Sequence, residues 1–275
     1  MCLKFINLLL FICILASATA FGDDNTKILN IKGGSLEYID IGGGEFTVVI
    51  ESGVGTGTGY WQPLLAMLRT LNQRVIIYSR AGIGRSTDNP DVTLQGSNKR
   101  LRALLLALNI KNNVILIGHS FGGLHARQYA FTFSEQVKGL ILLDPSHEGF
   151  LAELNKLNLE WSQRDNQQLN KMMHQNAEWS ILQKLYASNN MLDKGKVSSI
   201  PTVVISSSME GESDWWIGHS KSGKAVWRDL HASLIADNPN SVHIVSNTVS
   251  HNMPLDDPNL IVSSIMLLVN MLDDK

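Results

Sequence analysis

One segment of the chain combines a serine with the local backbone that would make its hydroxyl reactive. In Gly118-His119-Ser120-Phe121-Gly122-Gly123 the serine follows the apolar run 114–117 and precedes a helix-like stretch, 124–130. A G-x-S-x-G pattern between a strand and a helix is typical of a sharp turn that exposes a nucleophilic serine. The flanking glycines omit the Cβ atoms that would clash in such a turn. The segment therefore predicts Ser120 as a nucleophile.

A partial copy of the motif offers an internal comparison. Gly218-His219-Ser220 repeats the first three residues, but Ser222 stands where the second glycine would be and no apolar run precedes it. Because the chain contains 22 glycines, the pattern alone is a weak signal. The expected strand before Ser120 and the expected helix after it distinguish this motif from the partial copy at Ser220.

A serine hydroxyl attacks poorly unless a base removes its proton. Of the eight histidines, His251 is favoured because it falls in the loop 246–254, after the last expected strand and before the last helix. Loops at the edge of a sheet hold functional groups on a rigid support. His119 is adjacent to the serine, but a side chain at its position in the turn generally points elsewhere. We therefore expect His251 to be the base.

The base needs a carboxylate that fixes its tautomer and stabilises the imidazolium form. Asp144 ends one apolar run, and Glu210 lies in the loop after the next one. The residues themselves leave both alternatives open.

The tetrahedral intermediate of acyl transfer needs two N–H donors for its oxyanion. The amide of Phe121, directly after the nucleophile, is one candidate. The amide of Val54, in the glycine-rich segment 51–59, is the other.

Short apolar runs alternate with helical patterns along the chain, which predicts a mostly parallel, eight-stranded sheet with helices on both faces. A polar, helical stretch at about 146–199 interrupts this alternation and predicts an inserted helical cap. Further helices are expected at 60–71, 98–108 and 225–235 and from Asp257-Pro258 onward. The expected strands are 27–31, 35–41, 46–50, 75–78, 114–117, 137–143, 201–205 and 242–245.

The composition fits one globular domain, residues 21–275, since 44% of the 275 residues are hydrophobic. The net charge of −2 and the absence of a basic stripe exclude nucleic acid as an expected partner. A small-molecule substrate is the expected ligand, and the sequence gives no indication of the oligomeric state.

Residues 1–20 have the pattern of a signal peptide, with Lys4, the apolar run Leu8–Leu15 and a small-residue site at Ala18-Thr19-Ala20. The expectation is an exported, periplasmic or secreted protein with no stable membrane span after cleavage, although a retained anchor or a lipid at Cys13 stays open. Cys2 and Cys13 are the only cysteines, so the mature chain would have neither a disulfide nor a cysteine metal site.

Four segments together give the chain a specific resemblance to the α/β-hydrolase fold family, over essentially all of residues 28–275. They are Glu51-Ser52-Gly53-Val54-Gly55, the run 78–86 (YSRAGIGRS), the Ser120 motif and Ser250-His251-Asn252-Met253-Pro254. The resemblance implies a triad of serine, acid and histidine, acyl-transfer chemistry that is usually hydrolysis, and neither cofactor nor metal.

The chain departs from the family pattern at three places. Ser52-Gly53 stands where many relatives have His-Gly, and Ser79 where many have Asp. Glu210 occupies the region that usually supplies an aspartate, whereas Asp144 resembles the acid of relatives that place it after the sixth strand. The resemblance therefore leans slightly to Asp144.

These observations predict a serine hydrolase that cleaves a small, fairly apolar ester. Amide or lactone hydrolysis and aminopeptidase activity are alternatives on the same fold. A ligand-binding protein without catalysis is the alternative from another class.

Overall fold

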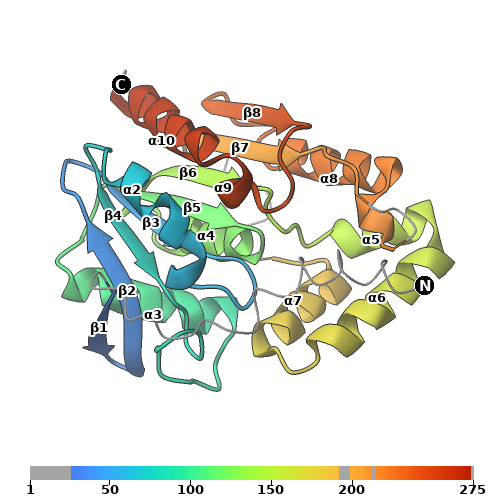
Figure 1. Ribbon diagram of the computed structural model, residues 1–275, viewed down its shortest axis with the longest axis horizontal. Coiled ribbons are helices and arrows are strands. Elements are labelled where there is room, and N and C mark those ends of the chain that lie inside the picture. Colours follow the sequence, from blue (N-terminus) through green and yellow to red (C-terminus); the bar gives the residue numbers. More distant parts are fainter. Residues whose placement is uncertain (1–25, 192–198, 212–214, 274–275) are drawn as a thin grey trace.

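The computed structural model describes residues 26–191, 199–211 and 215–273, and within them eight strands form one sheet (Figure 1). The order across the sheet is β1-β2-β4-β3-β5-β6-β7-β8. The pairs β1–β2 and β2–β4 are antiparallel and all the others are parallel, which confirms the predicted architecture. The strands are β1 (Thr26–Ile31), β2 (Gly34–Ile41), β3 (Thr47–Glu51), β4 (Arg74–Tyr78), β5 (Val114–His119), β6 (Val137–Leu143), β7 (Thr202–Ser207) and β8 (Ser241–Ser246).

Helices cover both faces of the sheet, because its central strands are apolar on both sides. In β5, Ile115 and Ile117 pack toward α2 (Leu65–Leu68) and α10 (Pro258–Asp273). The alternate residues Val114 and Leu116 pack toward the opposite layer. That layer contains α3 (Leu94–Ala107), α4 (Phe121–Thr132) and the two residues that follow α8 (Lys221–Ser233), Leu234 and Ile235. The remaining short helices are η2 (Thr58–Leu64), η3 (Ile217–His219) and α9 (Met253–Asp256).

The helix expected at 60–71 differs from the prediction. The chain forms the 3-10 helix η2 and then the single α-helical turn α2. Pro63 explains the difference: in an α-helix beginning at Tyr60, the fourth residue is the first whose N–H must donate, and proline has none. The N–H of Tyr60 instead donates to the Gly57 carbonyl three residues earlier, at 3.1 Å.

Three helices occupy the connection between β6 and β7: α5 (Phe150–Leu157), α6 (Leu159–Met173) and α7 (Ala177–Ser188). We call them the cap helices; Figure 1 shows them together beyond one end of the sheet. Asparagine side chains begin two of them, since Asn158 and Asn176 accept hydrogen bonds from the Trp161 and Trp179 amides. Nearby side chains thus fix where α6 and α7 begin.

The predicted signal segment, residues 1–20, lies outside the described residues, so export of the chain stays a prediction. Within the residues that the structure describes, no helix has both the length and the apolar character needed to cross a membrane.

Candidate active site

Ser120 occupies the turn between β5 and α4 in a backbone conformation that L-residues rarely adopt, with φ 54° and ψ −123°. The glycines around it are needed for this turn. A Cβ atom at Gly118 would lie 2.7 Å from the carbonyl oxygen of Gly122, and one at Gly122 would collide with the carbonyl of Glu51. Strain of this kind persists only where the surrounding structure enforces it, and it is concentrated at functional sites.

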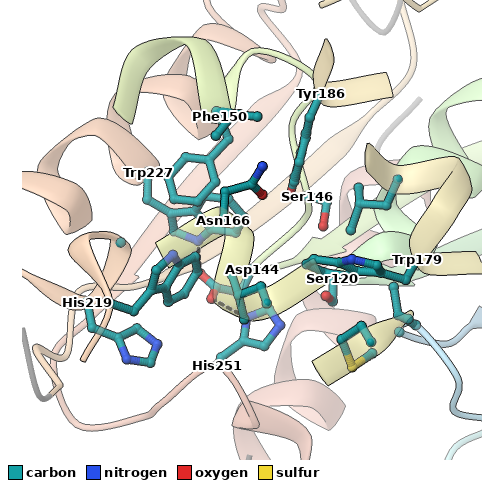
Figure 2. Close-up of a pocket in the computed structure, with 18 of the residues that line it drawn as sticks. Ser120, Asp144, Ser146, Phe150, Asn166, Trp179, Tyr186, His219, Trp227 and His251 are labelled. Atoms are coloured by element: carbon teal, nitrogen blue, oxygen red, sulfur yellow. Dashed lines mark hydrogen bonds and ion pairs between the residues drawn. The ribbon is translucent and has the colours of Figure 1, made fainter. Parts of the chain in front are cut away.

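His251 lies in the loop between β8 and α9, and its ring faces Asp144 at the end of β6. The Nδ1–H donates to Asp144 Oδ2 at 2.7 Å (Figure 2). Asp144 also has a positive φ, 41°, in the turn that presents its carboxylate. Glu210 is exposed in the loop after β7. Of the two carboxylates considered from the sequence, the structure thus brings Asp144 to the histidine.

The Asp144 carboxylate is held from several sides, and the residue is only 1% exposed. Its Oδ1 accepts hydrogen bonds from the Ser207 amide at 2.8 Å and from the Trp227 indole at 2.7 Å. Burial alone would raise the pKa of Asp144, but the hydrogen bond and charge of His251 outweigh it and lower that pKa. The carboxylate is therefore ionised at neutral pH.

Helix α8 holds the Asp144 turn through two side chains one helical turn apart, Trp227 and His231. Besides the Trp227 bond, His231 Nε2–H donates to the Pro145 carbonyl at 2.7 Å. Its Nδ1 then accepts the hydroxyl proton of Ser206, also at 2.7 Å. Sequence reasoning missed both residues, and the only signal was their spacing on a predicted helix.

His119 differs from the expectation that its side chain points away from the site. Its Nε2–H donates to the His251 carbonyl at 2.8 Å, and its ring stacks on Tyr60 with centroids 5.5 Å apart. Burial lowers the pKa of His119 to about 3. A neutral imidazole therefore fixes the backbone of the loop that supplies His251.

Ser120 and His251 both line one cavity of about 210 Å³ beneath the cap helices. In Figure 2, Ser120, Asp144 and His251 lie together on one side, while Phe150 and Tyr186 stand across from them. The wall is mostly apolar and aromatic, with Leu151, Leu154, Leu169, Met173, Trp179, Leu182, Trp215, Trp216 and Trp227 among its residues. Such a cavity suits an apolar ligand with few polar contacts.

The two amides expected to bind an oxyanion lie beside Ser120. Phe121 begins α4 directly after the serine, and Val54 follows Gly53, where an added Cβ would be 3.5 Å from Ser120 Cβ. Among the described residues, neither N–H donates to a protein acceptor. Neither amide is therefore committed to a protein acceptor, and the dipole of α4 favours negative charge near Ser120.

The departure at position 79 has a compensation in the fold. The Ser79 hydroxyl donates to Glu37 Oε1 at 2.8 Å. Glu37 lies on β2 and is 6% exposed. A buried carboxylate therefore lies beside position 79, although residue 79 does not provide it.

Within the described ranges, no group of three or more His, Cys, Asp or Glu side chains is arranged to hold a metal ion.

Buried and half-buried histidines make the fold sensitive to acid. Burial lowers the pKa of His119 to about 3, those of His219 and His231 to about 4, and that of His125 well below its ordinary value. In the unfolded chain these histidines have the ordinary pKa of about 6.5. Below that pH the unfolded state therefore binds protons that the folded state does not bind. Stability is full above this value and is lost as the pH falls toward the folded-state pKa values.

We expect the free energy of unfolding to decrease by about 1 kcal/mol per pH unit for each of these histidines between about pH 6.5 and 4.5. Urea unfolding at several pH values measures the slope. In His231→Asn the slope should become shallower by one histidine's share. An unfolding free energy that is constant over this interval contradicts the prediction.

Comparison with known proteins identifies the fold family. The family model of the alpha/beta hydrolase fold matches residues 47–209. The chain therefore belongs to the α/β-hydrolase fold family, and the prediction of a hydrolase enzyme agrees with that membership.

Particular relatives extend the comparison. The chain is 27% identical over 219 residues to uncharacterized protein YqjL of Bacillus subtilis, covering 78% of this chain and 80% of that protein. It is 35% identical over 121 residues to a cis-3-alkyl-4-alkyloxetan-2-one decarboxylase of Shewanella oneidensis, but this covers only 42% of the chain and 37% of the relative. An esterase of Thermogutta terrifontis has a similar fold, with a TM-score of 0.63 at 17% identity over 90% of this chain and 99% of the esterase.

Proposed function

We propose that the protein is a serine hydrolase that cleaves a small, fairly apolar ester through a triad of Ser120, His251 and Asp144. One observation supports this above all. The His251 Nδ1–H bond to the buried, ionised Asp144 is made at the cavity into which the strained Ser120 turn opens. An acid that orients the base, in the same cavity as a strained serine, is what supports a triad for covalent acyl transfer.

In the proposed first step, His251 Nε2 accepts the Ser120 hydroxyl proton while Oγ attacks the ester carbonyl carbon. The negative charge moves to the carbonyl oxygen, where the Val54 and Phe121 amides bind it. The imidazolium is stabilised by Asp144, which stays ionised. Collapse of the tetrahedral intermediate breaks the bond to the alcohol oxygen, and that oxygen takes the proton from His251.

The second step regenerates the enzyme. Water attacks the acyl carbon of the acyl-serine and gives a proton to His251, and the same two amides bind the second oxyanion. The intermediate then releases the carboxylic acid as Ser120 Oγ recovers its proton from His251. No cofactor enters either step.

The lining of the cavity favours an ester over an aminoacyl substrate. Among the described residues that line it, Asp144 is the only carboxylate, and its oxygens already accept three hydrogen bonds. A substrate with a free α-ammonium would lack a counterion there, and burying an unpaired charge is costly. The Thermogutta terrifontis relative is itself called an esterase, which agrees with this choice.

The experiment is a substrate panel of p-nitrophenyl esters of increasing acyl length, a lactone and an aminoacyl anilide. We expect the short acyl esters to have the highest kcat/KM, at least about tenfold above that of the decanoate ester. The reason is that each methylene that fits the cavity poorly weakens binding of the transition state. Cleavage of the aminoacyl anilide alone contradicts the proposal. So does a protein that hydrolyses no member of the panel and is not labelled by a fluorophosphonate.

A further inference from the structure

A carboxylate of the cap helices reaches into the body of the protein at the proposed oxyanion site. Glu178 lies in the first turn of α7 and is 4% exposed. Its Oε2 accepts a hydrogen bond from the Gly55 amide at 2.8 Å, although the two residues are 123 positions apart. Its Oε1 lies 2.5 Å from Arg80 Nε. Glu178 therefore contacts both the glycine-rich loop and a buried cation.

Arg80 holds the same loop from the other side. It is 2% exposed, and its guanidinium donates to the Ser52 carbonyl at 2.8 Å and to the Gly53 carbonyl at 2.7 Å. A further bond, 3.1 Å, reaches Glu51 Oε2 at the end of β3. The planar guanidinium suits such a role, because its donors lie in a fixed arrangement.

These bonds fix the backbone on both sides of Val54. The carbonyls of residues 52 and 53 bind Arg80, and the amide of residue 55 binds Glu178. The peptide group that carries the Val54 N–H is thus held through its Gly53 carbonyl, and the groups before and after it are held as well, while that N–H has no protein acceptor among the described residues. Donors that are already oriented bind a developing oxyanion without a reorganisation cost.

Helix α7 also forms part of the cavity wall. Trp179, the residue after Glu178, lines the cavity together with Leu182 and Tyr186 of the same helix. A ligand that packs against α7 therefore acts on the helix whose carboxylate holds the Gly55 amide. The loop and the cavity wall are thus connected through the hydrogen bond between Glu178 and the Gly55 amide and through the ion pair between Glu178 and Arg80.

We propose that Glu178 is a positioning residue. Through its bonds to Arg80 and to the Gly55 amide, it orients the Val54 N–H as an oxyanion donor. The orientation of this donor then depends on the position of the cap helices relative to the sheet. The inference rests on the proposed function. Glu178 itself is not in contact with the reacting atoms. Its effect is expected on the chemical step rather than on the binding of substrate.

The test compares Glu178→Gln with wild type and with Lys184→Gln, a charge-to-amide change at an exposed position of the same helix. Gln keeps the shape but loses one of the two carboxylate charges that pair with Arg80. We expect kcat for p-nitrophenyl butyrate and the rate of fluorophosphonate labelling to decrease together by about 10- to 100-fold, with KM changed less than about threefold. Lys184→Gln should match wild type.

Hydrogen exchange of the Gly55 amide is a readout that does not require activity. We expect it to accelerate by at least about tenfold in Glu178→Gln, with β3 and the rest of the cap helices unchanged. An unchanged Gly55 amide overturns the proposal. Accelerated exchange throughout α5–α7 with raised KM overturns it as well, because Glu178 would then only stabilise the cap helices.

The two proposals fail in different ways. If wild type neither turns over the panel nor is labelled, the proposed function is wrong, and the exchange of the Gly55 amide still decides whether Glu178 fixes the loop. If wild type is active and Glu178→Gln has the same kcat and labelling rate, the positioning role is wrong and the proposed function stands.

Discussion

Replacement of Ser120 by alanine should abolish hydrolysis, with kcat reduced by about 10⁴- to 10⁶-fold. The substitution removes the only atom that forms the proposed acyl bond, so neither base nor oxyanion donors have a covalent step left to assist. The fold should remain, because serine and alanine share the same backbone restriction at φ 54° and the position already accommodates a Cβ. Initial rates with p-nitrophenyl butyrate measure the loss of activity. Intact-mass detection of the fluorophosphonate adduct measures the loss of labelling, and urea unfolding measures the stability of the variant.

The partial motif supplies the matched control. Ser220→Ala changes the serine of Gly218-His219-Ser220, whose hydroxyl begins α8 by accepting the Gly223 amide at 3.0 Å. We expect this variant to lose about 1 kcal/mol of stability as a helix cap and to keep full labelling. A labelled Ser120→Ala protein, or an unlabelled Ser220→Ala protein that is folded, would place the nucleophile elsewhere.

The second large effect is expected at the acid. Asp144→Asn should lower kcat by about 10⁴-fold, because an amide cannot stabilise the imidazolium and its NH₂ favours the wrong His251 tautomer. Glu210→Gln, a matched charge-to-amide change at the exposed alternative, should alter kcat by less than about twofold. The activity of both variants and their circular dichroism spectra give the comparison.

The outcome separates the two carboxylates plainly. A large loss in Glu210→Gln together with an active Asp144→Asn protein would assign the acid to the loop after β7. It would also require the loop to approach His251 during turnover, since Glu210 is exposed in this structure. Asn at position 144 can still accept the hydrogen bond from the Trp227 indole, so we expect the Asp144→Asn protein to stay folded. Lost activity in this variant would then reflect the missing carboxylate and not unfolding.

The sheet was predictable because its strands are short apolar runs, and their apolar residues pack into cores on both faces. The connection that became η2 and α2 was not, because the position of one proline relative to the helix start decides which hydrogen bonds are possible. Local sequence predicts helices and strands well when burial and periodicity agree. It predicts them poorly when one missing N–H donor determines which type of helix can form.

The candidate site shows the same division. Ser120 is marked by its neighbours in sequence, whereas the contacts that distinguish Asp144 come from Ser207 and Trp227, which lie 63 and 83 positions away. Likewise, Arg80 and Glu178 are separated by 98 positions, and no short motif joins them. Pairings of this kind depend on how the layers pack, which the order of residues does not display.

The buried contact between α7 and the body of the protein has a consequence for anyone who wishes to redesign substrate preference. Side chains such as Leu151, Leu169 and Met173 can be exchanged to reshape the binding space, since they only face it. Transplanting the whole segment from β6 to β7 out of a homologue is different. A donor segment without a carboxylate at the Glu178 position would remove one of the two carboxylates that pair with the buried Arg80, so library construction should keep that acid and vary the residues around it.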